Sequence, residues 1–256
     1  MLNNMKVLQV NAVYGVRSTG RNCREIADYI RAKGGECISA CSERTDMPGA
    51  QCISPAWECK CHALLSRITG LQGYFSCVST ANLLRLIRDL QPDIVHLNNL
   101  HANYLQLNKL FRYLAAHDIA TVVTLHDCWV YTGKCTHYTS IGCNKWQTGC
   151  FACSKLKDDN ASWLFDRTPK MWRDKKNGWL SIPRLAVIGV SDWITNEAKK
   201  SPMFANAKII QRIYNWIDLD VFCPADPAAA KEKIGFSGKK IILGVASGWS
   251  NKKGLD

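Results

Sequence analysis

The sequence predicts an α/β fold: a doubly wound parallel sheet with helices on both of its faces. Short apolar runs typical of buried strands alternate along the chain with segments whose apolar residues recur at helical spacing. Gly34-Gly35 and Gln91-Pro92 close two of these helical segments. Because parallel strands need crossover helices, this alternation is typical of a Rossmann-like sheet.

The expected elements follow one another in chain order. The expected strands are Lys6–Val10, Cys37–Ala40, Asp93–Leu97, Thr121–Leu125, Leu185–Val190 and Lys208–Ile213. The expected helices are Asn22–Ala32, residues 83–90, Tyr104–Ala116 and a helix opened by Ser191. Residues 42–77 and 128–181 interrupt the rhythm with Gly, Pro, Cys and Trp, so we expect irregular excursions there, the second a Cys/Trp-rich insertion.

The end of the chain predicts a change of domain. We expect residues 1–213 to form one Rossmann-like domain and residues 214–238, which carry two prolines, to form a hinge or linker. The apolar run at 239–245 then reads as the first strand of a second Rossmann-like domain, and residues 239–256 as its truncated start.

The composition of the chain indicates the kind of partner it binds and the compartment it occupies. Lys and Arg number 33 against 21 Asp and Glu, a net charge of +12, which favours an anionic partner such as a nucleotide, a phospholipid surface or a nucleic acid. No apolar run approaches the roughly 18–20 residues that span a bilayer, and Met1–Val10 lacks signal-peptide features, so we expect a cytoplasmic protein. Its 13 cysteines are then core filler, reactive thiols or metal ligands.

Ligands of such sheets collect at the carboxyl ends of strands. In the loop after the first strand, Gly15 and Gly20 allow close backbone approach, and Ser18 and Thr19 offer hydroxyls. This loop is expected to contact phosphate or sugar, with an ordinary βα turn as the alternative; no G-x-G-x-x-G fingerprint marks a dinucleotide site.

Polar residues also follow two later strands. Asn98 and Asn99 come after one strand, and His126-Asp127 after the next. A histidine there can move a proton near neutral pH, and an adjacent carboxylate can fix its tautomer, so we expect His126 to contact the ligand. His96 and His101 are weaker candidates. No G-x-S-x-G, P-loop or H-E-x-x-H pattern occurs, which argues against hydrolase, NTPase and zinc-protease chemistry.

Two further patterns lie in residues 128–181. Cys135, Cys143, Cys150 and Cys153, the last two in C-x-x-C spacing, could close a structural zinc site; unbound thiols or an oxidation-sensitive pair are the alternatives. Met171–Trp179 mixes basic and aromatic residues and could rest on an anionic bilayer; a solvated helix face is the alternative.

The motifs carry a family resemblance. They are Pro92-Asp93-Ile94-Val95-His96-Leu97-Asn98-Asn99, Thr124-Leu125-His126-Asp127-Cys128-Trp129 with the Cys cluster, Val190-Ser191-Asp192-Trp193, and Tyr214-Asn215-Trp216-Ile217-Asp218 with Phe222-Cys223-Pro224. Together they resemble the retaining GT-B glycosyltransferases of family four, closest to the bacterial capsule and exopolysaccharide branch with colanic-acid-type transferases.

The resemblance implies two Rossmann-like domains facing a cleft, the first holding the acceptor and the second the nucleotide-sugar donor, with no catalytic metal. It implies catalytic roles for His126 and Asp127, and donor-phosphate contacts from Lys252, Lys253 and Gly254, although the family's Arg is not evident there. The implied substrate contacts are Gly15, Ser18, Thr19, Gly20, Asn98, Asn99, Ser191 and Asn215.

The resulting hypothesis is a hexosyltransferase that moves a hexose, with retention, from a nucleotide sugar to a growing cell-surface polysaccharide or a polyprenyl-diphosphate-linked glycan. It could contact the cytoplasmic membrane face peripherally and takes no nucleic acid; this chain alone is expected to be inactive. The alternatives are a noncatalytic glycan- or membrane-binding module and a zinc-stabilised nucleic-acid binder.

Overall fold

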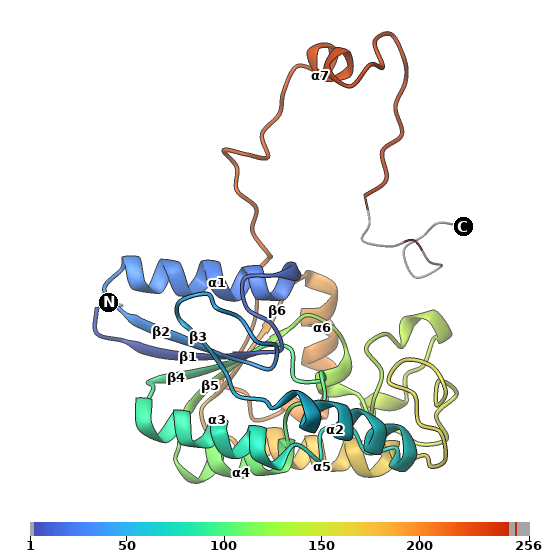
Figure 1. The fold of residues 1–256 in the computed structure, drawn as a ribbon. Coiled ribbons are helices and arrows are strands. Elements are labelled where there is room, and N and C mark those ends of the chain that lie inside the picture. The colour runs from blue at the N-terminus through green and yellow to red at the C-terminus, as the bar shows by residue number, and fades with distance from the viewer. Residues whose placement is uncertain (1–2, 246–248, 250–256) are drawn as a thin grey trace. The chain divides into compact units, whose positions relative to one another are not determined.

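The computed structural model describes residues 3–245 and residue 249 (Figure 1). The chain divides into two compact units, Met1–Tyr214 and a second unit that begins at Asn215. No helix within the described residues is both long and apolar enough to span a membrane.

The first unit is built on a seven-stranded parallel sheet. Its strands are β1 (Lys6–Asn11), β2 (Glu36–Cys41), β3 (Ala50–Cys52), β4 (Ile94–Leu97), β5 (Ala120–Leu125), β6 (Leu185–Gly189) and β7 (Ile209–Arg212). Their order across the sheet is β3-β2-β1-β4-β5-β6-β7, and every neighbouring pair is parallel. The chain therefore winds outward in two directions from β1 and β4, which confirms the predicted doubly wound, Rossmann-like sheet.

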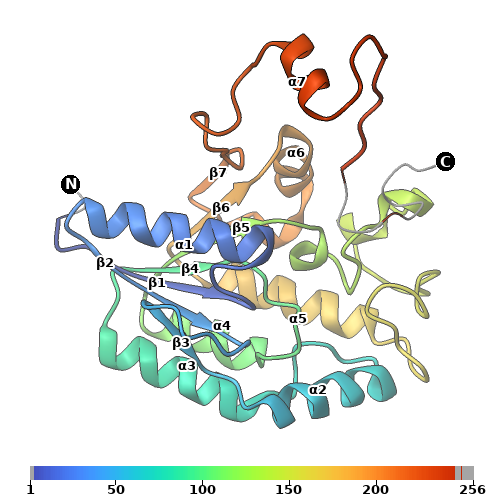
Figure 2. The ribbon, with the colours of Figure 1, turned by 45° about the horizontal axis from the view of Figure 1, so that its top comes forward.

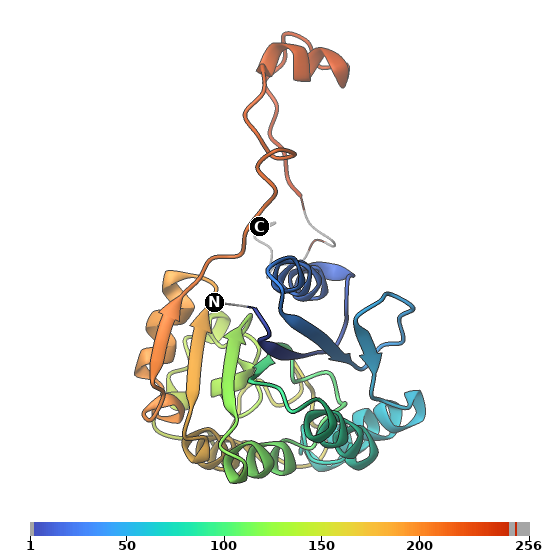
Figure 3. The same cartoon turned by 90° about the vertical axis from the view of Figure 1, so that its left-hand side faces the viewer.

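Helices cover both faces of this sheet. They are α1 (Arg17–Ala32), α2 (Ala56–Thr69), α3 (Cys77–Leu90), α4 (Leu107–Ala116), α5 (Thr168–Ser181) and α6 (Asp192–Lys200). Helix α1 lies on one face, and α3 and α4 lie on the other (Figures 1 and 3). Helices α1, α3 and α4 each present an apolar stripe to the strands. In α4 this stripe consists of Leu107, Leu110, Phe111 and Leu114.

Helix α1 begins five residues before the predicted start at Asn22. The sequence predicts Gly20 in a loop, but it lies inside the helix. A Cβ at this position would come within 2.9 Å of Val13 Cγ2, so a larger residue would not fit. The glycine permits the helix to approach the preceding loop closely, and the predicted loop is correspondingly shorter.

The interval 42–77 is more regular than predicted, since it contains β3 and α2. The buried residues of α2 are Glu58 and His62, so its inward face is polar. Both oxygens of the Glu58 carboxylate accept backbone N–H groups at the start of α3, from Val78 at 2.7 Å and Ser79 at 2.8 Å. The Glu58 carboxylate thus caps α3 and connects α2 to it by hydrogen bonds, where an apolar stripe would otherwise make the contact.

The membrane role expected for Met171–Trp179 is wrong. This segment belongs to α5, where Trp172 is 8% exposed and Trp179 only 1% exposed. The Lys175 ammonium is buried as well and donates to the carbonyls of Trp129 at 2.6 Å and Thr132 at 3.0 Å. The side chains of Trp172, Lys175 and Trp179 therefore hold α5 against the insertion and are not available to a bilayer. The ribbon of α5 runs beside that of the insertion (Figure 2).

The second unit contains one short helix in its described part, α7 (Pro227–Lys233), which Asp226 caps. The strand predicted over residues 239–245 is not formed, and Ile242, Leu243 and Val245 are exposed. A strand needs a neighbour for its backbone hydrogen bonds, and no strand occurs in the described residues of this unit.

Candidate functional site

The strand order of the sheet reverses between β1 and β4, so the loops that follow these strands open a crevice between them. Asn11, the last residue of β1, joins the two loops. Its Oδ1 accepts the N–H of Asn99 at 3.1 Å, and its Nδ2 donates to the carbonyl of Val13 at 2.8 Å. The loops that precede α1 and follow β4 are thereby fixed against each other.

The loop after β1 leads directly into helix α1. Gly15 has a φ of +70°, and a Cβ there would lie 2.2 Å from Met47 Sδ, so this position requires glycine. Ser18, Thr19 and Gly20 lie in the opening residues of α1, whose N-cap residue Val16 offers no side-chain cap. Backbone N–H groups at such a helix start suit an anionic group.

Asn98 and His126 meet at the carboxyl ends of β4 and β5. Leu97 lies opposite Val123 in this strand pair, and the register brings the following residues together. His126 Nε2 donates to Asn98 Oδ1 at 3.2 Å. Asn98 is 4% exposed, and its buried Nδ2 has no hydrogen-bond partner. An unsatisfied buried donor at a strand end is a position at which a ligand oxygen would be stabilised.

Burial lowers the pKa of His126, and the neighbouring Asp127 charge opposes this effect only in part. The imidazole is therefore neutral near pH 7. With its Nε2 proton directed to Asn98, its Nδ1 is the nitrogen that can accept a hydrogen bond.

Asp127 does not fix the tautomer of His126, and that expectation is wrong. One of its oxygens accepts from His101 Nε2 at 2.8 Å, and the other accepts the N–H of Trp129 at 2.8 Å. The carboxylate turns away from its sequence neighbour because the chain bends after β5 and Asp127 accepts the N–H of Trp129, the first residue of the short η1 helix (Trp129–Tyr131). The site therefore contains two pairs, Asn98 with His126 and His101 with Asp127.

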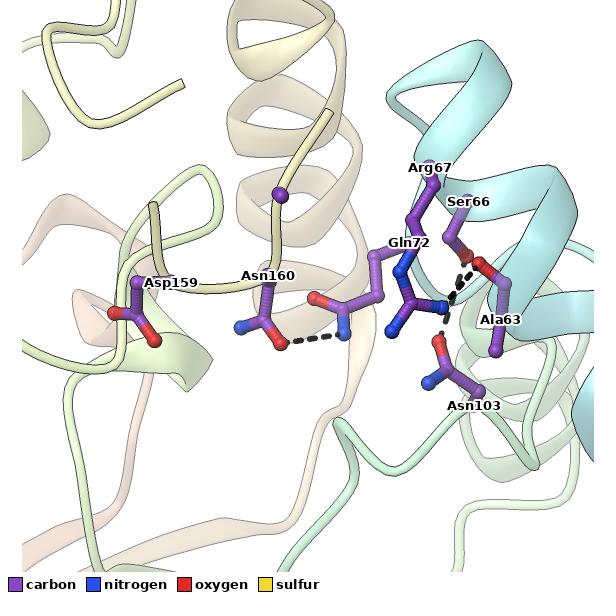
Figure 4. A pocket seen from close by; sticks show the side chains of 8 residues that line it. Ala63, Ser66, Arg67, Gln72, Asn103, Asp159 and Asn160 are labelled. Atoms are coloured by element: carbon purple, nitrogen blue, oxygen red, sulfur yellow. Dashed lines mark hydrogen bonds between the residues drawn. The ribbon is translucent and has the colours of Figure 1, made fainter. Parts of the chain in front are cut away.

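A polar cavity of about 300 Å³ lies beside the His101 pair. The side chains around it come from α2, from the two loops that follow α2 and β4, and from the insertion (Figure 4). They belong to Ala63, Ser66, Arg67, Gln72, Asn103, Asp159, Asn160 and Ala161.

Gln72 connects this cavity to the strand-end residues. Its Nε2 donates to the carbonyl of His101 at 3.0 Å and to Asn160 Oδ1 at 3.1 Å, and its Oε1 accepts from Trp129 Nε1 at 2.6 Å. Gln72, Asn103 and Asn160 are lining residues that the sequence analysis missed. They lie in loops, where apolar residues do not recur at a regular spacing. No sequence pattern therefore identified them as site residues.

The other predicted residues have different surroundings. His96 hydrogen bonds with Thr124 Oγ1 at 2.8 Å, and burial lowers its pKa to about 4, which makes it a neutral interior histidine. Ser191 caps α6 by accepting the N–H of Ile194. Asn215 belongs to the second unit. Lys252, Lys253 and Gly254 lie outside the described residues.

Comparison with known proteins matches residues 19–221 to the family described as Glycosyltransferase Family 4. The chain belongs to glycosyltransferase family 4. Over 78 residues it is also 36% identical to the putative colanic acid biosynthesis glycosyl transferase WcaC of Escherichia coli (strain K12). That match covers 28% of this chain and 19% of the relative, so it compares a small part of each protein.

The family match at residues 19–221 includes the carboxyl edge of the sheet with Asn98 and His126. This carboxyl edge offers donors from the helix start of α1 and the amide of Asn98, and an acceptor, Nδ1, from the neutral His126. Such groups bind hydroxyls and phosphate oxygens.

Proposed function

We propose that this chain is the acceptor-side domain of a retaining glycosyltransferase that moves a hexose from a nucleotide sugar to a growing cell-surface polysaccharide or a lipid-linked glycan. Its family supports sugar transfer, and the WcaC relative, a putative colanic acid biosynthesis glycosyl transferase, supports a polysaccharide product.

One observation carries the proposal: the Asn98 and His126 pair at the carboxyl edge of the sheet, with the unpartnered Nδ2 of Asn98 between strands β4 and β5. A hydroxyl-rich ligand offers the acceptor that this amide lacks. His126 then contacts the transferred sugar through its neutral imidazole.

Glycosyl transfer breaks a bond to a diphosphate while the anomeric carbon becomes cationic. Positive charge and N–H groups must therefore stabilise the leaving group. In this proposal they come from the helix start at Gly15, Ser18, Thr19 and Gly20 and from Lys252, Lys253 and Gly254, and no catalytic metal takes part. Asp127 positions His101 and Trp129 at the adjoining wall.

The acceptor occupies the polar cavity beside this site. Its lining combines the Arg67 guanidinium with the amides of Gln72, Asn103 and Asn160, which suits the hydroxyls and phosphate of a polyprenyl-diphosphate-linked glycan. Asn99, Ser191 and Asn215 are proposed to add substrate contacts.

An apolar rim beside this cavity supports peripheral contact with the cytoplasmic face of a membrane. The rim is Trp163, Leu164 and Phe165, which are 48%, 64% and 47% exposed. It lies against the end of α2, since the Trp163 N–H donates to the carbonyl of Arg67 at 2.6 Å. The Arg167 guanidinium lies 5.3 Å from the centre of the Phe165 ring. Aromatic residues next to cations suit an anionic bilayer surface.

The test uses the protein that contains this chain. It is incubated with a panel of radiolabelled UDP-, GDP- and TDP-hexoses and with membranes of the cells it comes from. The proposal expects label from one donor in a lipid or polysaccharide fraction, with the anomeric configuration of that donor. Label transfer with inversion would contradict the retaining mechanism, and no transfer from any donor would contradict the function.

A further inference from the structure

The later part of the insertion between β5 and α5, residues 139–167, has almost no apolar interior. In residues 139–167, all of which the structure describes, Trp146 is the one buried apolar side chain. Two short 3-10 helices, η2 (Thr139–Ile141) and η3 (Lys145–Gln147), are its regular elements. Ordering each residue costs roughly 1–2 kcal/mol of backbone entropy, which a single buried tryptophan does not offset over such a length. Another interaction must hold the segment together.

Four cysteines meet in this segment. Cys135, Cys143, Cys150 and Cys153 all line one cavity of about 30 Å³. A cavity of this size holds one water molecule or one ion and is far too small for a sugar. Cys150 Sγ accepts the N–H of Gly133 at 3.2 Å. Backbone N–H groups directed at sulfur are partners of the kind that orient metal-bound thiolates.

Two lysines line the same cavity and join its walls. Lys134 Nζ donates to the carbonyls of Lys155 and Leu156 at 2.8 and 2.7 Å, and Lys145 Nζ donates to the carbonyls of Phe151 and Ala152 at 3.1 and 3.0 Å. A divalent ion with four thiolates carries a net charge of −2, which two lysine ammonium groups balance.

We propose that Cys135, Cys143, Cys150 and Cys153 bind one structural Zn²⁺ ion. Four thiolates close the tetrahedral coordination that zinc prefers and leave no open position for catalysis. Within the described residues no three ligand-type side chains are yet grouped as a metal centre, so binding requires the sulfurs to converge on the cavity.

The ion would also support the acceptor cavity. Thr136, next to Cys135, donates its backbone N–H to Asp159 Oδ2 at 2.8 Å, and Asp159 and Asn160 line that cavity. Zinc would therefore hold the wall that the insertion contributes. The proposal itself depends only on the cysteines and not on the sugar-transfer function.

The test measures metal in protein purified under reducing conditions without a chelator. Elemental analysis should find about one zinc per chain, and titration with an organomercurial should release it as four thiols react. Cys143→Ser should lose at least most of the zinc, whereas Cys61→Ser, which changes an exposed cysteine on α2, should retain it.

If Cys143→Ser does not fold, the wild-type protein reconstituted with a second metal still tests the proposal. Wild-type protein stripped of metal and given Co²⁺ should show thiolate-to-cobalt charge-transfer and tetrahedral d–d absorption bands. Purified wild-type protein without zinc that also binds no Co²⁺ would overturn the proposal. A disulfide between Cys135 and Cys153 in freshly isolated protein would also overturn it and would identify an oxidation-sensitive pair.

Discussion

The imidazole of His62 lies in a buried hydrogen-bond network between α2 and the loop before α3. Its Nδ1 donates to Ser76 Oγ at 2.6 Å, and its Nε2 accepts the N–H of Gly73 at 3.1 Å. Ser76 in turn donates to the carbonyl of Asn103 at 3.0 Å, so the network reaches the polar cavity. Protonation of Nε2 would remove the acceptor that Gly73 needs.

This network predicts acid sensitivity. Burial lowers the pKa of His62 from 6.5 to about 4, against the opposing charge of Glu58. The unfolded chain therefore takes up a proton at higher pH than the folded one, and stability is lost as pH falls from about 6.5 toward 4. At pH 5 the loss from His62 is about 2 kcal/mol.

Urea unfolding at pH 7 and pH 5 measures this effect. His62→Gln should shrink the difference in unfolding free energy between the two pH values by about 2 kcal/mol, whereas His117→Gln, at the exposed end of α4, should keep it. If the pH-dependent difference in unfolding free energy is unchanged in His62→Gln, His62 does not cause the acid sensitivity.

The Phe111 ring of α4 packs directly on Gly178 of α5. A Cβ at this position would come within 2.1 Å of Phe111 Cδ2. Replacing a helical glycine with alanine normally stabilises a helix by up to about 1 kcal/mol, but overpacking here costs about 1–3 kcal/mol, so the steric cost should prevail.

Thermal and urea unfolding compare Gly178→Ala with Asn177→Ala, its exposed neighbour. Gly178→Ala should lower the unfolding free energy by about 1–2 kcal/mol, and Asn177→Ala should leave it within about 0.5 kcal/mol. A stabilised Gly178→Ala protein would mean that the Phe111 ring does not pack directly on Gly178.

Six strands (β1, β2, β4, β5, β6 and β7) and the amphipathic helices α3, α4 and α6 could be predicted from the sequence, because their buried faces require apolar residues at a regular spacing. Strand β3 was not predicted. Helix α2 could not, since its inward residues are Glu58 and His62. Helix α5 was obscured by the buried Lys175 between its aromatic residues. At the site, the strand ends indicated Asn98 and His126, but the pairing of His101 with Asp127 depends on a bend after β5 that no local pattern encodes.

For the whole molecule, the net charge of +12 and the apolar rim at Trp163–Phe165 predict binding to an anionic membrane. Sedimentation with phosphatidylglycerol vesicles measures it, with phosphatidylcholine vesicles for comparison. Trp163→Ala combined with Phe165→Ala should lower the vesicle-bound fraction several-fold. Tyr29→Ala, which removes an exposed aromatic that Lys33 approaches on α1, should not.

Equal binding to both vesicle types would show that charge plays no part. Binding that survives the double substitution would place the membrane contact elsewhere on the protein.

The central claim is that the carboxyl edge of the sheet, at Asn98 and His126, is where sugar transfer takes place. The most direct measurement is the turnover of His126→Ala in the complete protein with its accepted nucleotide sugar, beside His117→Ala as an exposed control. A positioned polar group in an active site contributes roughly 10²-fold, so His126→Ala should lose at least that much while its unfolding transition stays close to wild type. Near-normal turnover in a folded His126→Ala protein would contradict the claim.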